Sequence, residues 1–173
     1  MTETTRYERL AQRNLFDEFL ALRDLQRKQR ETAEIIARGK EIPEELNRQG
    51  FMKWYMGPML DDIVMKTFII YVQRIPAGSR SGKQLFQGHQ IGFIWKGGPG
   101  YTVIDEVRYD WDRWDVVQIP LKVKGVVVQH FNDSDDDIEI IFTSLNHAHS
   151  ASIDRGSGFE QLEDCPEYRA SRR

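Results

Sequence analysis

Two different periods of apolar residues divide this chain. Between residues 5 and 38 apolar side chains recur at steps of three and four, and no glycine or proline occurs before Gly39. Arginine, glutamate, lysine and glutamine, which favour helices, occupy most other positions. This pattern predicts one long amphipathic helix. Its apolar stripe consists of Leu15, Phe19, Leu22, Leu25, Ala33 and Ile36.

From residue 65 onward the pattern becomes that of β-strands. β-Branched and aromatic residues dominate 68–75, and a turn follows at Pro76–Gly78. Turn-forming residues also separate the later apolar runs. About eight short strands with no helices between them predict an all-β barrel or sandwich. The remaining strands are expected at 83–87, 91–96, 100–105, 108–111, 115–119, 125–131 and 137–143.

The helix and the methionine-rich segment 51–59 together predict an interface. The helix either packs on its own barrel or crosses to another polypeptide. A barrel fills its interior with its own alternating strand residues, so a long helical stripe is surplus apolar surface, and exposed apolar patches mark association sites. Methionine also adapts well to irregular contacts. The expected interface residues are Leu15, Phe19, Leu22, Met52, Trp54, Met56 and Met59.

Composition narrows the functional class. A net charge of −3 argues against nucleic acid as a partner. No run of 18 apolar residues is present to predict a membrane span, and residues 1–13 are too charged for a signal peptide, so a cytoplasmic location is expected. The single Cys165 fits a reducing compartment. We expect a helical arm over 1–50, a β-barrel over 51–145 and a tail over 146–173.

The spacing of glycines and polar residues in the β-region follows a known skeleton. Its first part places Gly78, Gln84, Phe86, Gln90 and Gly97 at intervals of six, two, four and seven. A second part follows, with the members Pro120, Gly125, Val128 and Asn132. This skeleton resembles the cupin superfamily, whose two motifs read G-x5-H-x-H-x3-E-x6-G and G-x5-P-x-G-x2-H-x3-N. The resemblance implies a jelly-roll barrel.

In cupins the three histidines and the glutamate of these motifs hold one metal ion. The corresponding positions here are Gln84, Phe86, Gln90 and Val128. Amide and hydrocarbon side chains do not replace imidazole and carboxylate ligands. We therefore expect no metal, no cofactor and no catalytic residue in this chain. The expected pocket residues are Gln84, Phe86, Gln90, Val128, His130 and Trp95.

Other histidines leave an alternative metal site open. His130 lies two residues beyond Val128 and faces the same way on a strand, while His89 adjoins Gln90. Two imidazoles without a carboxylate bind a metal weakly. His147 and His149 share one face if extended, but no third ligand accompanies them.

A finer resemblance concerns the activity. The segments that carry it are 74–83, 100–105, 109–111, 115–120, 129–132 and 160–168. They resemble cupins allied to aromatic ring-cleaving dioxygenases, which use non-haem Fe(II) and O₂ on gentisate- or hydroquinone-type substrates. The chain is most similar to the small, iron-free subunit of two-component hydroquinone 1,2-dioxygenases. This implies a non-catalytic subunit, with Fe(II) on a larger cupin partner, and self-association is also expected. Two alternatives remain: a metal-free cupin that binds small molecules, and an independent metalloenzyme with a shifted histidine site.

Overall fold

The protein is described by a computed structural model over residues 5–146 and 159–172. The chain divides into two compact units. One unit combines the N-terminal residues up to Ile35 with Asp61–Val64, and the other contains Ile36–Leu60 and everything from Met65 onward. No helix of the described residues is long and apolar enough to cross a membrane.

The first unit contains helices α1 (Arg6–Leu10) and α2 (Leu15–Thr32). The prediction of one continuous helix over 5–38 is therefore wrong between residues 11 and 14. Asn14 adopts an extended backbone conformation, and its side chain accepts a 3.2 Å hydrogen bond from the amide of Asp17. Asparagine is a preferred N-cap, so it begins a new helix instead of continuing the first.

α2 ends earlier than the sequence pattern predicts. Ala33 is extended, and Glu34 then forms a parallel bridge with Ile63. The backbone of this segment therefore pairs with another segment instead of completing further helical turns. No residue of α1 or α2 is buried.

In its described residues, the second unit consists of β-strands and one short helix, α4 (Pro166–Ser171). The strands are β1 (Glu45–Asn47), β2 (Gly50–Met56), β3 (Phe68–Ile75), β4 (Lys83–Phe86), β5 (Gln90–Lys96), β6 (Gly100–Ile104), β7 (Val107–Trp111), β8 (Val116–Ile119), β9 (Val126–Asn132), β10 (Ile138–Leu145) and β11 (Glu160–Glu163).

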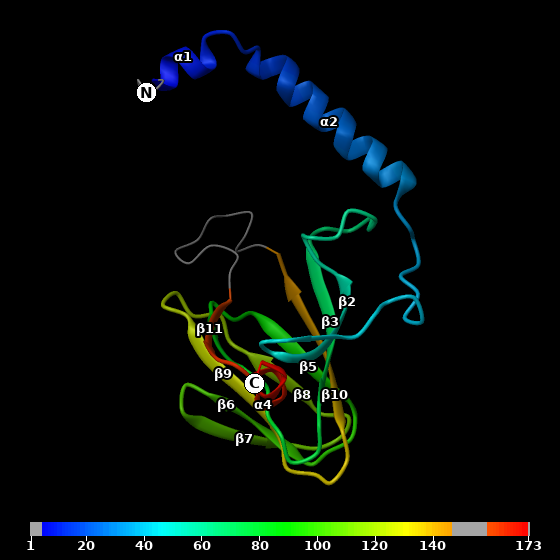
Figure 1. Ribbon diagram of the computed structural model, residues 1–173, viewed down its shortest axis with the longest axis vertical. Helices are drawn as coiled ribbons and strands as arrows, with labels where there is room; N and C mark the ends of the chain where they lie inside the picture. Colours follow the sequence, from blue (N-terminus) through cyan, green and yellow to red (C-terminus); the bar gives the residue numbers. More distant parts are fainter. Residues whose placement is uncertain (1–4, 147–158, 173) are drawn as a thin grey trace. The chain divides into compact units, whose positions relative to one another are not determined.

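These strands form two antiparallel sheets (Figure 1). The six-stranded sheet has the order β1-β2-β3-β10-β5-β8, and the five-stranded sheet has the order β11-β4-β9-β6-β7. Many neighbours in a sheet, such as β3 and β10 or β4 and β9, are far apart in the sequence, as in a jelly roll. The eight predicted strands are all present, with ends that differ by at most two residues. β1, β2 and β11 were not predicted.

The core lies between the two sheets. Ile138, Ile140 and Phe142 alternate along β10 and are each at most 1% exposed. Ile75, Ile94 and Val126 join them from three other strands. This alternation is what an antiparallel sheet with one buried face requires.

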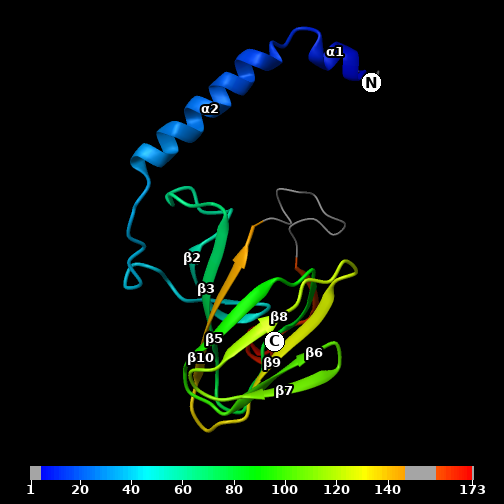
Figure 2. The ribbon, with the colours of Figure 1, turned by 180° about the vertical axis from the view of Figure 1, so that it is seen from behind.

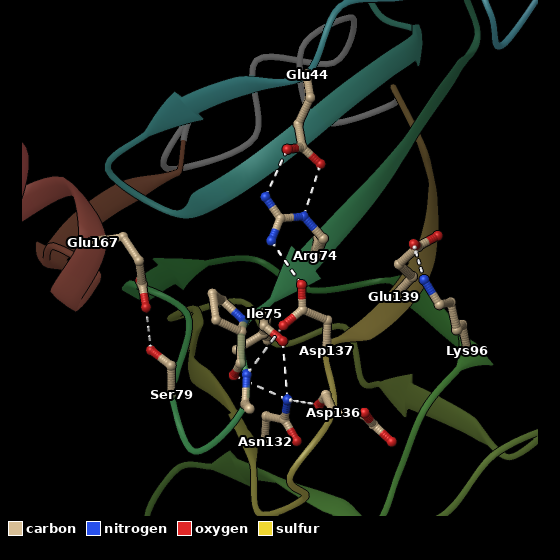
Figure 3. A network of polar contacts seen from close by, with 12 residues as sticks. Glu44, Arg74, Ile75, Ser79, Lys96, Asn132, Asp136, Asp137, Glu139 and Glu167 are labelled. Atoms are coloured by element: carbon tan, nitrogen blue, oxygen red, sulfur yellow. Dashed lines mark hydrogen bonds and ion pairs between the residues drawn. The ribbon is translucent and has the colours of Figure 1, made fainter.

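Asn132, the last residue of the motif skeleton, fixes the loop between β9 and β10. Its side-chain nitrogen lies 2.8–3.0 Å from the carbonyl oxygens of Ile75, Pro76 and Asp136 (Figure 3). The loop between β9 and β10, which contains four aspartates within residues 133–137, is thereby tied to the end of β3. The amide thus satisfies backbone carbonyl groups where the chain leaves the sheet.

Candidate functional site: the barrel interior

Strands β4 and β9 bring three of the four skeleton positions together. Gln84 lies directly opposite Val128, and Phe86 lies opposite Val126. Directly opposed residues point to the same side of an antiparallel pair, so these side chains share the inner face. Phe86 is 5% exposed and Val128 is 3% exposed. The Phe86 ring also packs on that of Phe159, with centroids 4.9 Å apart.

The fourth position, Gln90, enters from β5 in the facing sheet. It is buried, and its Nε2 donates a 3.1 Å hydrogen bond to the hydroxyl oxygen of Tyr71. Burial raises the pKa of Tyr71, so the phenol stays protonated. The Tyr71 ring packs against Trp54 and Phe142, with centroids 4.8 and 5.2 Å apart. Aromatic rings and one amide therefore occupy this part of the interior.

His130 belongs to a buried chain of hydrogen bonds. Trp111 Nε1 donates to Thr102 Oγ1 over 2.9 Å, and Thr102 Oγ1 lies 2.8 Å from His130 Nδ1. The Thr102 hydroxyl therefore links the indole of Trp111 to the imidazole of His130 in the interior of the barrel. Burial lowers the pKa of His130 to about 3, so the ring is neutral.

These residues do not fit the metal ion that cupins hold. The skeleton positions offer two amides, a phenyl ring and an isopropyl group, and Nδ1 of His130 is engaged in a hydrogen bond with the Thr102 hydroxyl. Among residues 5–146 and 159–172, no three His, Cys, Asp or Glu side chains lie close enough together to hold a metal. His89 is exposed. His147 and His149 lie outside the described residues.

Trp95 lies outside the barrel interior. It is 48% exposed on the outer face of the six-stranded sheet, where it lines a separate hollow. The reason is the two-residue period of a strand: Gln90 points inward, and Trp95, five positions later, points outward.

The predicted interface residues divide between the interior and the surface. Met52 is 3% exposed and packs in the core, so its predicted exposure is wrong. Segment 51–59 contains most of strand β2, whose alternate residues face inward. Trp54 and Met56 are partly buried. The remaining residues are exposed: Leu15, Phe19, Leu22 and Met59.

A groove between the edges of β7 and β8 was not predicted from the sequence. It has a volume of about 920 Å³ and includes Gln90, but none of the other three skeleton positions. At one end Lys122 hydrogen-bonds Asp105 over 2.5 Å and holds the pKa of that carboxyl below its usual range. The groove lies between two strands that are not paired with each other, so no local sequence pattern indicates it.

Comparisons with known proteins agree on the fold. No protein-family model matches the sequence, and no curated protein matches it. Solved structures do match. A Cupin 2 conserved barrel domain protein from Salinispora arenicola has 20% identity and a TM-score of 0.49, over 70% of this chain and 93% of that chain. The polyketide cyclase RemF from Streptomyces resistomycificus has 7% identity and a TM-score of 0.52, over 65% and 79%.

Salicylate 1,2-dioxygenase from Pseudoaminobacter salicylatoxidans, in complex with gentisate, also matches. It has 20% identity and a TM-score of 0.50, over 84% of this chain and 37% of that chain. This chain therefore spans little more than a third of the dioxygenase. Likeness at this level of identity concerns the fold and not the reaction. The two facing sheets and their strand order, together with the two neighbours whose TM-scores reach 0.50, show a double-sheet jelly-roll fold.

Proposed function

We propose that this chain is a non-catalytic cupin subunit of a heteromeric non-haem Fe(II) dioxygenase that cleaves aromatic rings of the hydroquinone type. A larger cupin partner carries the iron. The observation that supports this most is the set of inward-facing skeleton positions, Gln84, Phe86, Gln90 and Val128, which present no imidazole or carboxylate. A barrel that keeps this skeleton without ligands contributes structure to an assembly and no chemistry of its own.

The exposed stripe of α2 supports a role in assembly. Phe19 is 65% exposed and Leu22 is 50% exposed, although both are large apolar side chains on one side of a helix. Contiguous exposed apolar surface of this kind is typical of association sites. In this proposal α2 is an arm that binds the larger subunit, and the complex completes the substrate pocket of that subunit.

The single thiol is consistent with a structural role in a reducing cytoplasm. Cys165 is fully buried and caps α4, where its sulfur accepts a 3.5 Å hydrogen bond from the amide of Tyr168. Burial raises the pKa of the thiol, which lowers its nucleophilicity at neutral pH. Cys165 therefore stabilises the C-terminal helix and has no role in the reaction.

Co-expression of this chain with a larger iron-bearing cupin, sought among its genomic neighbours, tests the proposal. Oxygen-dependent ring cleavage of hydroquinone is measured for each chain alone and for the co-expressed pair. We expect no turnover by this chain and full turnover only by the pair. Equal turnover by the larger cupin with and without this chain, or turnover by this chain alone, would contradict the proposal.

A further inference from the structure

The outer face of the six-stranded sheet carries an apolar row that crosses four strands. Val72 lies opposite Ile141, Ile141 lies opposite Phe93, and Phe93 lies opposite Val116. Opposed residues of antiparallel pairs share a face, so these four side chains form one row across β3, β10, β5 and β8. Figure 2 shows the ribbons of these four strands. The solvated face of an antiparallel sheet is normally polar. This row therefore lacks the polar side chains expected of a solvated surface.

An aromatic cluster adjoins this row. Trp95 lies 6.4 Å from Phe93 and 5.7 Å from Trp114, and Phe93 lies 6.1 Å from Trp114, measured between ring centroids. Trp95 is 48% exposed and Trp114 is 54% exposed. Tryptophan is enriched among the residues that dominate binding energy at interfaces. Two half-exposed tryptophans in contact make the centre of an association surface.

The backbone of Trp114 strengthens this interpretation. Its φ is +77°, in the left-handed region, and its amide donates a 2.9 Å hydrogen bond to the carbonyl of Ile94. A bulky side chain in this region is an outlier, because its Cβ crowds the following carbonyl oxygen. Glycine or asparagine would adopt the same turn at lower cost. The strained backbone therefore places a tryptophan side chain where, among the described residues, about half of its surface is exposed to solvent.

A hollow lies beside the cluster on the same face. It has a volume of about 420 Å³, and Trp95 forms one of its walls. Its apolar lining includes Tyr55, Ile70, Val72 and Ile141. Since Trp95 contacts Trp114 and also lines the hollow, the projecting indole of Trp114 and the hollow are neighbours on one surface.

We propose that this face binds the same face of a second copy of the chain. A twofold axis near Trp95 would place Trp114 of each copy in the hollow of the other. An interface with twofold symmetry needs a projection and its complementary hollow on one patch, because each copy supplies both. The face meets this requirement, which favours a second copy over an unrelated partner.

The charges around the patch also suit a second copy. They include two pairs of opposite sign, Glu44 with Arg74 at 2.7 Å and Glu139 with Lys96 at 3.1 Å (Figure 3). A patch whose rim carried a single sign would repel its own copy. Arg113, whose guanidinium lies 4.3 Å from the Trp114 ring centroid, would accompany that ring toward a hollow whose charged lining has both signs: Glu44, Glu139, Lys53 and Arg74.

The available apolar area agrees with the size of such an interface. Ile91, Trp95, Trp114 and Val116 are each about half exposed. With about 250 Å² for a whole tryptophan, these side chains offer roughly 400 Å², about half of the ~800 Å² that each partner buries in a standard interface. The partly exposed row and the charged rim supply the remainder. This surface belongs to the barrel unit, so the inference does not depend on the proposed function.

Sedimentation velocity of the full chain over a range of micromolar concentrations tests the inference. We expect a dimer whose tryptophan emission shifts to shorter wavelength as it forms. Trp114→Asn removes the ring but suits the left-handed backbone, so it should fold normally and raise the dimer dissociation constant about 30-fold or more. Trp95→Ser is a second variant with the same expectation. Leu162→Asn, a change at a similarly exposed residue of the other sheet, should leave the dimer unchanged.

Four results would overturn the inference. The first is a wild-type chain that remains monomeric at high micromolar concentration. The second is an unchanged dissociation constant in both tryptophan variants. The third is a dimer that dissociates only when residues of α2 are substituted, which would assign self-association to the helix. The fourth is a monomer whose binding to the larger cupin is lost with Trp114→Asn, which would assign this face to the heteromer.

Discussion

Acidification should destabilise this protein through His130. Burial lowers its pKa from the ordinary 6.5 to about 3 in the folded state. Between these values the unfolded chain takes up a proton that the folded chain does not, so unfolding becomes more favourable as the pH falls. The contribution of the neutral ring to stability is complete above pH 6.5 and is lost progressively toward pH 3.

The size of the effect follows from the two pKa values. Between about pH 7.5 and pH 5 the free energy of unfolding should fall by about 2 kcal/mol. The carboxyl groups with perturbed pKa values, such as Asp105 and Glu44, have theirs lowered, so they titrate mainly below this range. The loss within the range is therefore assigned to His130.

Urea unfolding at several pH values measures this loss. His130→Asn keeps an acceptor, Oδ1, near the position of Nδ1 but has no proton to take up. It should be less stable at pH 7.5, because it leaves a small cavity, and should lack the extra loss of about 2 kcal/mol. His89→Asn is the control, since His89 is exposed and its φ of +61° suits asparagine. An equal loss in wild type and His130→Asn would refute the reasoning.

Three further outcomes are expected. Phe86→Ala should lower the free energy of unfolding by about 3–5 kcal/mol in chemical denaturation, because it empties a buried ring site; a loss below about 1 kcal/mol would contradict this. Elemental analysis of the chain expressed alone in iron-supplemented medium should find far less than one iron, manganese or zinc per chain. Phe19→Asp with Leu22→Asp should abolish co-purification with the larger cupin but leave the β-sheet circular dichroism intact, and retained co-purification would remove α2 from the interface.

The local pattern of residues was sufficient to predict eight of the strands and part of the barrel interior. β3 was predicted at its observed bounds, because its β-branched and aromatic residues end at a proline and a glycine. The spacing of two between Gln84 and Phe86 was enough to place both on one face, and the same argument linked Val128 to His130. The outward position of Trp95 could also have been predicted, since it lies an odd number of positions from the inward-facing Gln90.

The features that could not be predicted depend on contacts between residues that lie far apart in the sequence. Met52 is buried because β2 pairs with β3, and a shift of one residue in that pairing would have turned it outward. The break between α1 and α2 at Asn14 could not be predicted, because asparagine can either cap a new helix or lie inside a longer one, and helix propensity alone does not distinguish the two. The β7–β8 groove and the aromatic cluster of Phe93, Trp95 and Trp114 arise between strands and loops that meet only in the folded sheet. The sequence by itself therefore determined the cupin skeleton and its missing ligands, whereas the surfaces available for binding were decided by tertiary structure, because strand register selects the face that each side chain occupies.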